Sequence, residues 1–330
     1  MSCLNKFHIL EINHLSISFQ QYKSGTRQRN LPVISNLNVS VHEGEIVAVV
    51  GASGSGKSLL AHAILGLLPS NAHQEGEFFF LEKILDEKRK KKVRGKEIAF
   101  VPQSVNYLDP LIKVGSQVRN GRKSKEAKDR QRELFQKYGL GNQTEVRYPF
   151  ECSGGMIRKI LLSAALMEYP RLLIADEPTP GMDLETAKKA MEDFRRFADR
   201  GNGVLLITHD IELALEVADR IAVFYAGTTV EEALVEDFSS EERLRHPYTK
   251  ALWRAMPKHG FEVMEGHQPY AGQWPKGCVF GPRCPKFGPE CETEIPERVV
   301  RCGTVRCIRC KEDISSNHHE KREAHRHVGG

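Results

Sequence analysis

A glycine-rich segment at residues 51–58, GASGSGKS, most constrains what this chain can fold into. It fits the pattern GxxxxGK[ST] in full, follows the apolar run EIVAVVG (45–51) and precedes SLLAHAILGLL (58–68), whose apolar residues recur with helical spacing. This strand–loop–helix order is that of a phosphate-binding loop, or P-loop. Backbone N–H groups then wrap the phosphates, Lys57 reaches the β- and γ-phosphates, and the Ser58 hydroxyl joins a Mg²⁺ shell. The nucleotide-binding residues predicted here are Gly51, Ser53, Gly54, Ser55, Gly56, Lys57 and Ser58.

Two later apolar runs, RLLIAD (171–176) and GVLLITHD (203–210), end in polar residues. Such runs are typical of parallel strands buried on both faces, whose carboxyl ends carry functional side chains. We therefore expect Asp176 to hold Mg²⁺ and Glu177 to take a proton from the attacking water. His209 ends the next run and is expected to contact the γ-phosphate.

The alternation of strands and helices predicts an α/β fold. Residues 20–32, QQYKSGTRQRNLP, read as a loop, and residues 124–140 fit an amphipathic surface helix. The basic run 88–96, KRKKKVRGK, reads as a solvated surface loop, because a nucleic-acid patch would contain interleaved aromatic residues. No apolar run reaches the ~18 residues that span a bilayer and the start lacks a signal-peptide pattern, so we expect a cytosolic protein.

A second candidate phosphate site lies at residues 151–160, ECSGGMIRKI, where Ser153-Gly154-Gly155 run into a predicted helix. Small residues with bare N–H groups at a helix start suit a phosphate. Together with the motifs above, this segment resembles the signature of the nucleotide-binding subunit of ABC transporters. The resemblance implies a P-loop NTPase cassette with a RecA-like core, an antiparallel β subdomain and a helical subdomain. It also implies a head-to-tail dimer, in which the signature of one subunit closes over ATP held by the P-loop of the other.

Three further positions match elements of that family. Gln103, in IAFVPQ, matches the loop glutamine that approaches Mg²⁺ and water and contacts the membrane subunits. Asp183, in PGMD, matches the D-loop aspartate at the dimer interface, and Phe19 lies where an aromatic ring stacks on adenine, with Tyr22 as the alternative.

The sequence also departs from the family pattern around the signature. Cys152 replaces the usual Leu, Ile157-Arg158-Lys159 replace Arg-Gln-Arg, and PGMD replaces the commoner SALD. Ser153 and both glycines are kept, so phosphate recognition is expected to be intact. The changes bear on how tightly the dimer closes and on whether the second ATPase is an identical or a related chain.

The C-terminal third extends the resemblance. HPYTKALWRAMP (246–257) and GCVFGPRCPKFGPEC (277–291) resemble the C-terminal region of the oligopeptide, dipeptide and nickel importer subfamily. We predict a nucleotide-binding domain over 8–258, with a helical subdomain at about 104–165, and a cysteine-rich extension over 259–312. Residues 313–330, with His318, His319, His325 and His327, are predicted to form a disordered tail, the alternative being a metal-binding one.

Six of the eight cysteines lie in the extension: Cys278, Cys284, Cys291, Cys302, Cys307 and Cys310. In a cytosolic chain such crowding favours a metal site over disulfides. Four thiolates fit a [4Fe–4S] cluster or tetrahedral Zn²⁺, and the third alternative is reduced cysteines without metal. By resemblance to the subfamily, the ligands are Cys278, Cys284, Cys291 and Cys307; the CxxC at 307–310 would suit zinc.

The resemblance implies an ATP-hydrolysing subunit of an importer for peptides or for nickel and other metal complexes. Its cofactors would be ATP and Mg²⁺. Its partners would be a second ATPase, two transmembrane permease subunits and, indirectly, an extracytoplasmic binding protein, with no nucleic acid. It would lie peripherally on the cytoplasmic face of the plasma membrane. The alternative is a soluble ABC ATPase acting on nucleic acid in repair or at the ribosome, although such proteins usually contain coiled-coil insertions, zinc modules or tandem cassettes.

Overall fold

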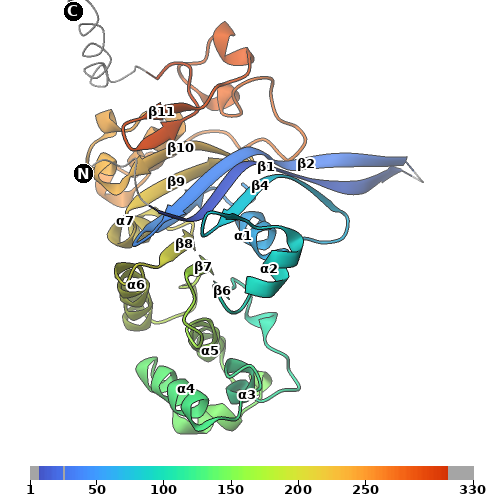
Figure 1. The fold of residues 1–330 in the computed structure, drawn as a ribbon. Coiled ribbons are helices and arrows are strands. Elements are labelled where there is room, and N and C mark those ends of the chain that lie inside the picture. The colour runs from blue at the N-terminus through green and yellow to red at the C-terminus, as the bar shows by residue number, and fades with distance from the viewer. Residues whose placement is uncertain (1–6, 25–26, 311–330) are drawn as a thin grey trace, which may run out of the picture.

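The computed structural model describes residues 7–24 and 27–310, and these form two β-sheets with helices around them (Figure 1). The larger sheet has eight strands in the order β11-β12-β10-β9-β3-β8-β7-β6. In chain order its strands are β3 (Ile46–Gly51), β6 (Ile98–Val101), β7 (Leu172–Asp176), β8 (Gly203–Ile207), β9 (Arg220–Tyr225), β10 (Thr228–Leu234), β11 (Arg298–Val300) and β12 (Gly303–Val305).

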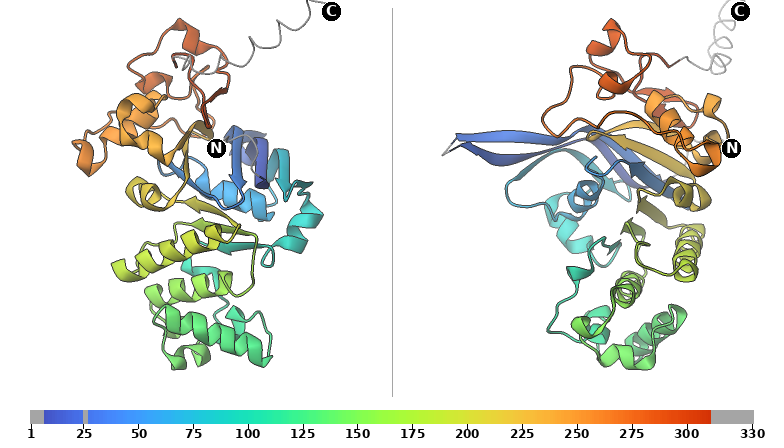
Figure 2. Two further views of the ribbon diagram at one scale, coloured as in Figure 1. Left: turned by 60° about the vertical axis from the view of Figure 1, so that its left-hand side comes forward. Right: turned by 180° about the vertical axis from the view of Figure 1, so that it is seen from behind.

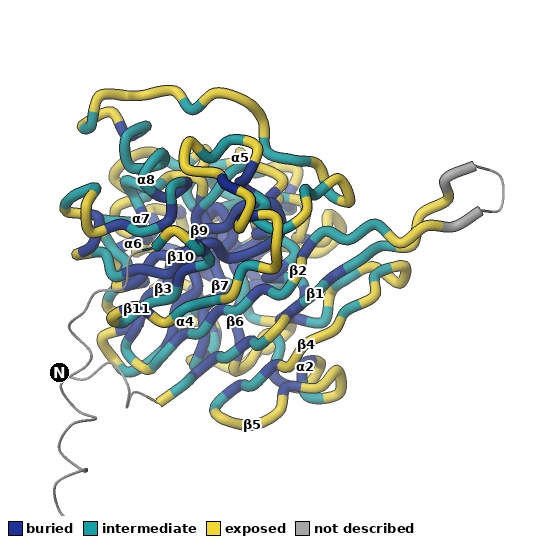
Figure 3. Tube along the Cα trace, turned by 90° about the horizontal axis from the view of Figure 1, so that it is seen from above, coloured by how far each residue is buried: buried dark blue, intermediate teal, exposed yellow. Residues whose placement is uncertain are grey.

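The centre of the larger sheet is parallel, from β9 through β3, β8 and β7 to β6. Every residue of β7, β8 and β9 is buried, as expected for apolar runs covered on both faces (Figure 3). Two separate apolar clusters pack on the sheet, one containing Ala48, Leu173 and Leu206 and the other Val49, Ile174 and Ile207. The α/β fold predicted from the sequence is confirmed.

A four-stranded antiparallel sheet, in the order β2-β1-β4-β5, packs against this core. Its strands are β1 (His8–Ser24), β2 (Arg27–His42), β4 (Ala72–Phe80) and β5 (Lys83–Ile84). The predicted loop over residues 20–32 is wrong, because β1 and β2 continue as a paired hairpin well beyond the core (Figure 3). Pairs such as Gln21 with Arg29 extend the ladder, so backbone pairing holds a polar segment that has no apolar alternation.

Eight α-helices are found among the described residues: α1 (Lys57–Leu65), α2 (Glu87–Val93), α3 (Val114–Val118), α4 (Lys125–Lys137), α5 (Gly154–Ala165), α6 (Leu184–Asp199), α7 (Ile211–Val217) and α8 (Pro247–Arg254). Short 3₁₀ turns join them: η2 (Val105–Tyr107), η3 (Asn142–Val146), η4 (Pro149–Glu151), η5 (Val235–Ser239), η6 (Glu241–Arg243), η7 (Pro257–His259), η8 (Gly281–Arg283) and η9 (Pro289–Glu292). Helices α3, α4 and α5 gather at the end of the molecule opposite the C-terminal extension (Figures 1 and 2).

Residues 88–93 of the basic run belong to helix α2 (Glu87–Val93), so the prediction of a loop is wrong over that part of the run. Asp86 caps the helix by accepting a hydrogen bond from the Arg89 N–H at 2.7 Å. Lys90 is only 2% exposed, its ammonium lying 4.2 Å from the Phe78 ring centroid and 2.7 Å from a Glu87 oxygen. The sequence does contain a helix-start signal that the prediction overlooked: Asp86, a favourable capping residue, precedes a run of good helix formers.

The extension adds strands to the core sheet instead of forming a sheet of its own. Strand β12 pairs antiparallel with β10, joining Glu231 to Val305 and Glu232 to Thr304, and β11 pairs with β12. Figure 2 shows the extension lying over this edge of the cassette. The predicted tail with its four histidines lies outside the described residues. Among residues 7–24 and 27–310, no helix is both long and apolar enough to cross a bilayer.

Candidate nucleotide-binding site

The P-loop lies between β3 and α1, as the sequence predicts. Gly51 has a φ of 151°, and a Cβ atom there would lie 2.2 Å from the Phe224 carbonyl oxygen of β9. A glycine is therefore required, because any side chain would push the loop off the neighbouring strand. The glycines leave the turn open for a phosphate to approach the backbone.

The Lys57 side chain folds back over this loop. Its ammonium donates to the Gly51 and Ala52 carbonyl oxygens at 2.7 and 3.0 Å. Burial lowers the pKa of Lys57, while the carboxylates of Glu177 and Asp176 act in the opposite direction. The lysine is thus held among groups that a triphosphate can replace with its own oxygens.

Asp176 lies beside the P-loop at the end of β7. Burial raises the pKa of the Asp176 carboxyl, and a hydrogen bond from Ser58 lowers it. Within the described chain, its Oδ1 atom is buried and has no hydrogen-bond partner. A buried carboxylate oxygen and a serine hydroxyl at one point fit the oxygen donors that Mg²⁺ prefers.

Glu177 follows directly, in a strained conformation with a φ of 47°. Its N–H donates to the Ile207 carbonyl at 2.8 Å, which ties it to the end of β8. Its Oε1 atom lies 2.8 Å from Nδ1 of His209, and its buried Oε2 atom has no partner among the described residues. The structure therefore brings together Lys57, Asp176, Glu177 and His209, which the sequence placed on separate segments.

Gln103 follows β6 and is exposed. Two neighbours of this region were missed by the sequence analysis, Tyr107 and His62. The Tyr107 hydroxyl lies 3.1 Å from Nε2 of His62, and burial together with the Asp176 charge raises the pKa of Tyr107. His62 lies on α1 only five residues after Lys57, and this short separation could have indicated that His62 is near the P-loop.

The signature loop begins helix α5. Ser153 caps this helix by accepting from the Met156 N–H at 3.3 Å. A Cβ atom at Gly154 would meet nothing within 4 Å, whereas one at Gly155 would lie 3.2 Å from the Gly181 oxygen. Ser153 and Gly154 are exposed, and no hydrogen bond in the described chain joins the signature loop to the P-loop of the same chain.

Two of the three residues that depart from the family pattern in α5, Arg158 and Lys159, contact other motifs within the chain. Arg158 donates to the Glu177 carbonyl oxygen at 3.4 Å, and Lys159 lies 3.3 Å from an Asp183 oxygen. Asp183 also caps α6 by accepting from the Thr186 N–H at 2.8 Å. This hydrogen bond above all lowers the pKa of Asp183 to about 2.

Two aromatic side chains were candidates for stacking on adenine. Phe19 is half-buried and packs against the apolar cluster beneath the antiparallel sheet. Tyr22, three residues further along β1, is 72% exposed. Exposure favours Tyr22 as the free ring, while Phe19 lies closer to the core.

Tyr248 of α8 was also missed, although it belongs to the HPY segment. It is 2% exposed, and its ring packs on Tyr225 and Phe280 at centroid distances of 4.5 and 5.5 Å. Burial raises the pKa of Tyr248 to about 12, and a hydrogen bond from the Ala52 backbone acts against this. The peptide group between Gly51 and Ala52 thus contacts both side chains. Its N–H donates to the Tyr248 hydroxyl, and its carbonyl oxygen accepts from the Lys57 ammonium.

Four of the predicted metal ligands, Cys278, Cys284, Cys291 and Cys307, are unpaired thiols. The Cys278 N–H donates to the Cys291 oxygen at 2.9 Å, and burial raises the pKa of Cys307 to about 11, with smaller contributions from Cys278 and Cys284. The structure thus brings these cysteines into one neighbourhood. Within the described residues, however, no three His, Cys, Asp or Glu side chains are arranged to hold a metal ion.

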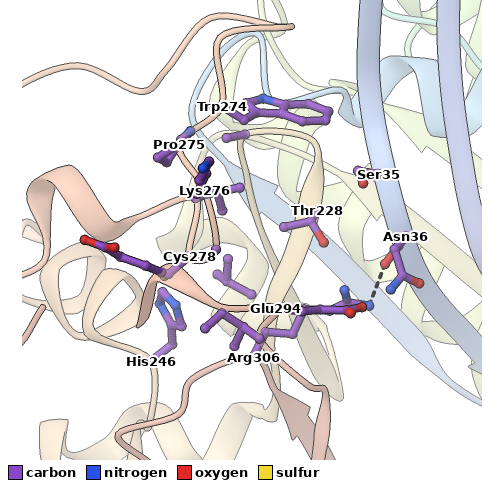
Figure 4. Close-up of a pocket in the computed structure, with 16 residues that line it drawn as sticks. Ser35, Asn36, Thr228, His246, Trp274, Pro275, Lys276, Cys278, Glu294 and Arg306 are labelled. Carbon is purple, nitrogen blue, oxygen red and sulfur yellow. Dashed lines mark hydrogen bonds between the residues drawn. The ribbon is translucent and has the colours of Figure 1, made fainter. Parts of the chain in front are cut away.

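A cavity of about 490 Å³ separates the extension from the cassette (Figure 4). Trp274, Lys276 and Cys278 line it from the extension, and Ser35 and Thr228 line it from the sheets. Arg306 spans the gap and donates to the Asn36 backbone oxygen. Its lining includes no residue of the P-loop or the signature loop, although Gly227, between the lining residues Ala226 and Thr228, donates to the Ser55 oxygen of the P-loop at 3.2 Å.

Comparison with known proteins agrees with this geometry. A family model described as "ABC transporter" matches residues 34–180, and one described as "Oligopeptide/dipeptide transporter, C-terminal region" matches residues 230–291. The oligopeptide transport ATP-binding protein AppD of Bacillus subtilis is 34% identical over 327 residues, covering 92% of this chain and 98% of the relative. The chain therefore belongs to the family of ABC transporter ATP-binding proteins for oligopeptide and dipeptide transport. The dipeptide transport ATP-binding protein DppD of Haemophilus influenzae is 33% identical, covering 90% of this chain and 95% of the relative.

Solved structures support the fold of this ABC-type ATPase. The dimeric structure of MJ0796, a bacterial ABC transporter cassette, matches with a TM-score of 0.60 and 28% identity, over 68% of this chain and 98% of that one. A dimeric post-hydrolysis state of MJ0796 bound to ADP and Pi matches with a TM-score of 0.59 and the same 28% identity. The relatives named above are transport proteins and cover nine-tenths of this chain or more, so the alternative of a nucleic-acid ATPase receives no support from them.

Proposed function

We propose that this ATPase drives peptide uptake, with Glu177 as the general base of hydrolysis. The observation that carries the assignment is the convergence of Lys57, Asp176, Glu177 and His209 at one edge of the parallel sheet. Lys57 would hold the β- and γ-phosphates, and Ser58 and Asp176 would hold Mg²⁺, which supplies charge neutralisation at the phosphates.

The unpartnered Oε2 atom of Glu177 is placed to accept the proton of the attacking water. His209, 2.8 Å from the other oxygen, would orient the carboxylate and contact the γ-phosphate. Water then attacks the γ-phosphorus, the bond to the β-phosphate oxygen breaks, and ADP and phosphate leave.

The signature loop supports a head-to-tail dimer. Ser153, Gly154 and Gly155 lie at the start of α5, where Ser153 and Gly154 are exposed, so their N–H groups would cap the nucleotide of a second ATPase. The MJ0796 structures are dimers, which is consistent with this arrangement. The second subunit would be an identical or a related chain.

The other partners follow from the same assignment. Gln103 would join the Mg²⁺ and water site to two permease subunits, on the cytoplasmic face of the plasma membrane. An extracytoplasmic binding protein would deliver the cargo. The relatives are named for oligopeptides and dipeptides, so we propose peptides as the cargo; nickel complexes receive no support from these names.

The proposal also includes a metal site at the cysteines of the extension. Cys307 is buried and Cys278 and Cys284 are half-buried, and burial raises the pKa of all three thiols. With Cys291, they supply the donor set of a [4Fe–4S] cluster or of Zn²⁺ after a side-chain rearrangement. We infer that a metal would bind here, because the four thiols lie in one neighbourhood and a metal would displace their protons and hold them as thiolates.

The dimer is tested with Gly154→Asp beside Lys57→Ala. Gly154 has open space around it, so the isolated subunit should fold and bind ATP nearly as before. A carboxylate facing the partner's γ-phosphate should abolish ATPase activity of the reassembled transporter. Lys57→Ala should instead weaken nucleotide binding itself. Loss of ATP binding by isolated, folded Gly154→Asp protein would mean that the loop serves its own chain.

Cargo and metal are tested separately. ATP-driven peptide uptake by the transporter reconstituted with its cognate binding protein should require this subunit, and nickel uptake alone would overturn the cargo assignment. Anaerobically purified protein should contain bound iron with broad visible absorbance, or stoichiometric zinc, and Cys307→Ser should lower the metal content. Protein without either metal would reject the metal site.

A further inference from the structure

The cavity of about 490 Å³ between the extension and the cassette is lined by two buried polar groups that the protein itself does not satisfy (Figure 4). Among the described residues, the hydroxyl of Thr228 and the Nε atom of Arg306 are buried and form no hydrogen bond. Thr228 lies in β10 and is only 8% exposed. Leaving such donors unpaired is unfavourable, so both are suited to an acceptor that enters the cavity.

Arg306 is held in place by its other hydrogen bonds. Its backbone N–H donates to the Val230 oxygen at 2.9 Å, which fixes it beside β10. Its Nη2 atom donates to the Asn36 backbone oxygen and lies 3.1 Å from a Glu297 carboxylate oxygen. The protein therefore leaves the Nε–H donor unused. A carboxylate has two oxygens and can accept from this group and from the Thr228 hydroxyl together.

The remaining lining suits a small ligand with an apolar body and an ammonium group. Trp274 and Ile295 supply apolar surface from the extension. Glu292, Glu294 and Lys276 also line the cavity but are exposed, and within the described residues none of the three forms an ion pair. Two carboxylates at this solvent-facing rim would attract an ammonium group, while the buried donors would hold a carboxylate.

The β9–β10 turn connects this cavity to the P-loop. Thr228 is preceded by Gly227, whose N–H donates to the Ser55 oxygen of the P-loop at 3.2 Å. The Gly227 oxygen in turn accepts from the Ser35 N–H at 2.9 Å, and a Cβ atom at Gly227 would lie 2.9 Å from the Trp274 ring. A ligand that contacts Thr228 and Trp274 would therefore press on a turn that contacts the P-loop.

A second connection runs through helix α8. His246 lines the cavity and caps α8, with its Nδ1 atom accepting from the Tyr248 N–H at 3.1 Å. The Tyr248 hydroxyl accepts from the Ala52 N–H of the P-loop. The cavity and the nucleotide site thus share two contiguous sets of contacts.

We propose that this cavity binds a short peptide with apolar side chains, and that its occupancy is linked to nucleotide affinity. The peptide carboxylate accepts from Thr228 and Arg306, and an apolar side chain packs on Trp274. The peptide ammonium group lies at the rim, beside Glu292 and Glu294. The cavity volume is within the range of small-molecule sites. A short peptide is also what the proposed uptake would deliver, so a role in feedback rests on the proposed function, whereas the binding does not.

The experiment titrates L-leucyl-L-leucine into the isolated full chain by calorimetry, and one site per chain is expected. L-leucyl-L-leucinamide, which lacks the carboxylate, should bind at least about tenfold more weakly, because hydrogen bonds to a charged acceptor are lost. No transport is measured, so a failure here would leave the proposed uptake standing. An absence of dipeptide binding, or equal binding of the two compounds, would overturn the proposal.

The site is located with threonine variants. Thr228→Val should weaken dipeptide binding by at least about tenfold without lowering the thermal midpoint, since its hydroxyl has no partner in the described chain to lose. Thr228→Ser keeps the hydroxyl and should retain most of the affinity. Thr304→Val makes the same change on β12, outside the lining, and is the matched control. Wild-type affinity in Thr228→Val would place the peptide elsewhere and overturn the proposal.

The link to the nucleotide is measured on the same wild-type chain. Affinity for Mg²⁺ with a non-hydrolysable ATP analogue is determined with and without saturating L-leucyl-L-leucine, and a change of at least about threefold is expected. The nucleotide must then change the dipeptide affinity by the same factor. Identical nucleotide affinities in the two titrations would overturn the link.

Discussion

At the nucleotide site, Asp176, Glu177 and His209 lie at the ends of adjacent parallel strands, whereas Cys278, Cys284, Cys291 and Cys307 lie in loops and short turns. Strands β7 and β8 are buried along their whole length, so they fix the backbone from which these side chains emerge. The extension is held by two short strands, aromatic packing and ion pairs.

The nucleotide site and the cysteines of the extension differ in how far their side chains are positioned before a ligand binds. A hydrogen-bonded sheet fixes catalytic groups before ATP arrives, and this is how an active site stabilises developing charge without reorganisation. The cysteines have been brought near one another but are not arranged around a metal. We therefore expect the extension to depend on a ligand or a metal for its final order, and the nucleotide site to be independent of both.

The largest expected effect tests the pre-organised site. Glu177→Gln should lower ATP turnover in the transporter by about 10²–10⁴-fold while ATP binding persists, because a general base is lost but the phosphate contacts remain. ATPase assays beside equilibrium binding measure both. Glu185→Gln, which removes an exposed carboxylate of α6, is the control. Near-normal turnover by Glu177→Gln would exclude the role.

The next effect tests the backbone of the same site. Gly51→Ala should weaken ATP binding by about ten- to a hundredfold, because the new methyl group would lie 2.2 Å from the Phe224 oxygen and the loop must shift. Calorimetric titration of ATP measures the change. Gly141→Ala, at a position with no atom within 4 Å, should bind as the wild type does.

A matching glycine-to-alanine change in the extension should show whether disorder in the extension affects ATP binding. In Gly303→Ala, the methyl group would lie 1.9 Å from the Glu232 oxygen, which costs the pairing of β12 with β10 about 1–3 kcal/mol. Faster proteolysis of residues after 260 is expected, with nearly unchanged ATP affinity. Val299→Ala, an exposed change on β11, is the control. A collapse of ATP binding would show that the extension supports the nucleotide site directly.

The smallest effect tests the contact of helix α8 with the P-loop, between Tyr248 and Ala52. Tyr248→Phe removes the hydroxyl that faces the Ala52 N–H and should weaken ATP binding by about two- to tenfold, the effect of one hydrogen bond. Tyr225→Phe removes a hydroxyl that accepts from Arg283 in the extension and should leave ATP affinity unchanged. If the wild type, Tyr248→Phe and Tyr225→Phe bind ATP with equal affinity, the P-loop does not depend on its contact with α8.

Much of the nucleotide site could be predicted because its motifs are local. GASGSGKS carries its glycines, lysine and serine in eight consecutive residues, and the burial of β7 predicts where Asp176 and Glu177 emerge. The hairpin over residues 20–32 could not be predicted, since a polar segment forms strands only when a partner strand satisfies its backbone. Helix α2 was missed because Lys90 counts as a surface residue until Phe78 is packed against it.

By itself, the sequence determined the α/β fold, the P-loop and the family, because these depend on apolar periodicity and on short motifs that act through their own backbone. Only the tertiary structure decided that Glu177 meets His209 and that Tyr248 meets Ala52. Each of these joins residues that are far apart in the chain. Their proximity is set by how the strands and the extension pack, and no local pattern records it.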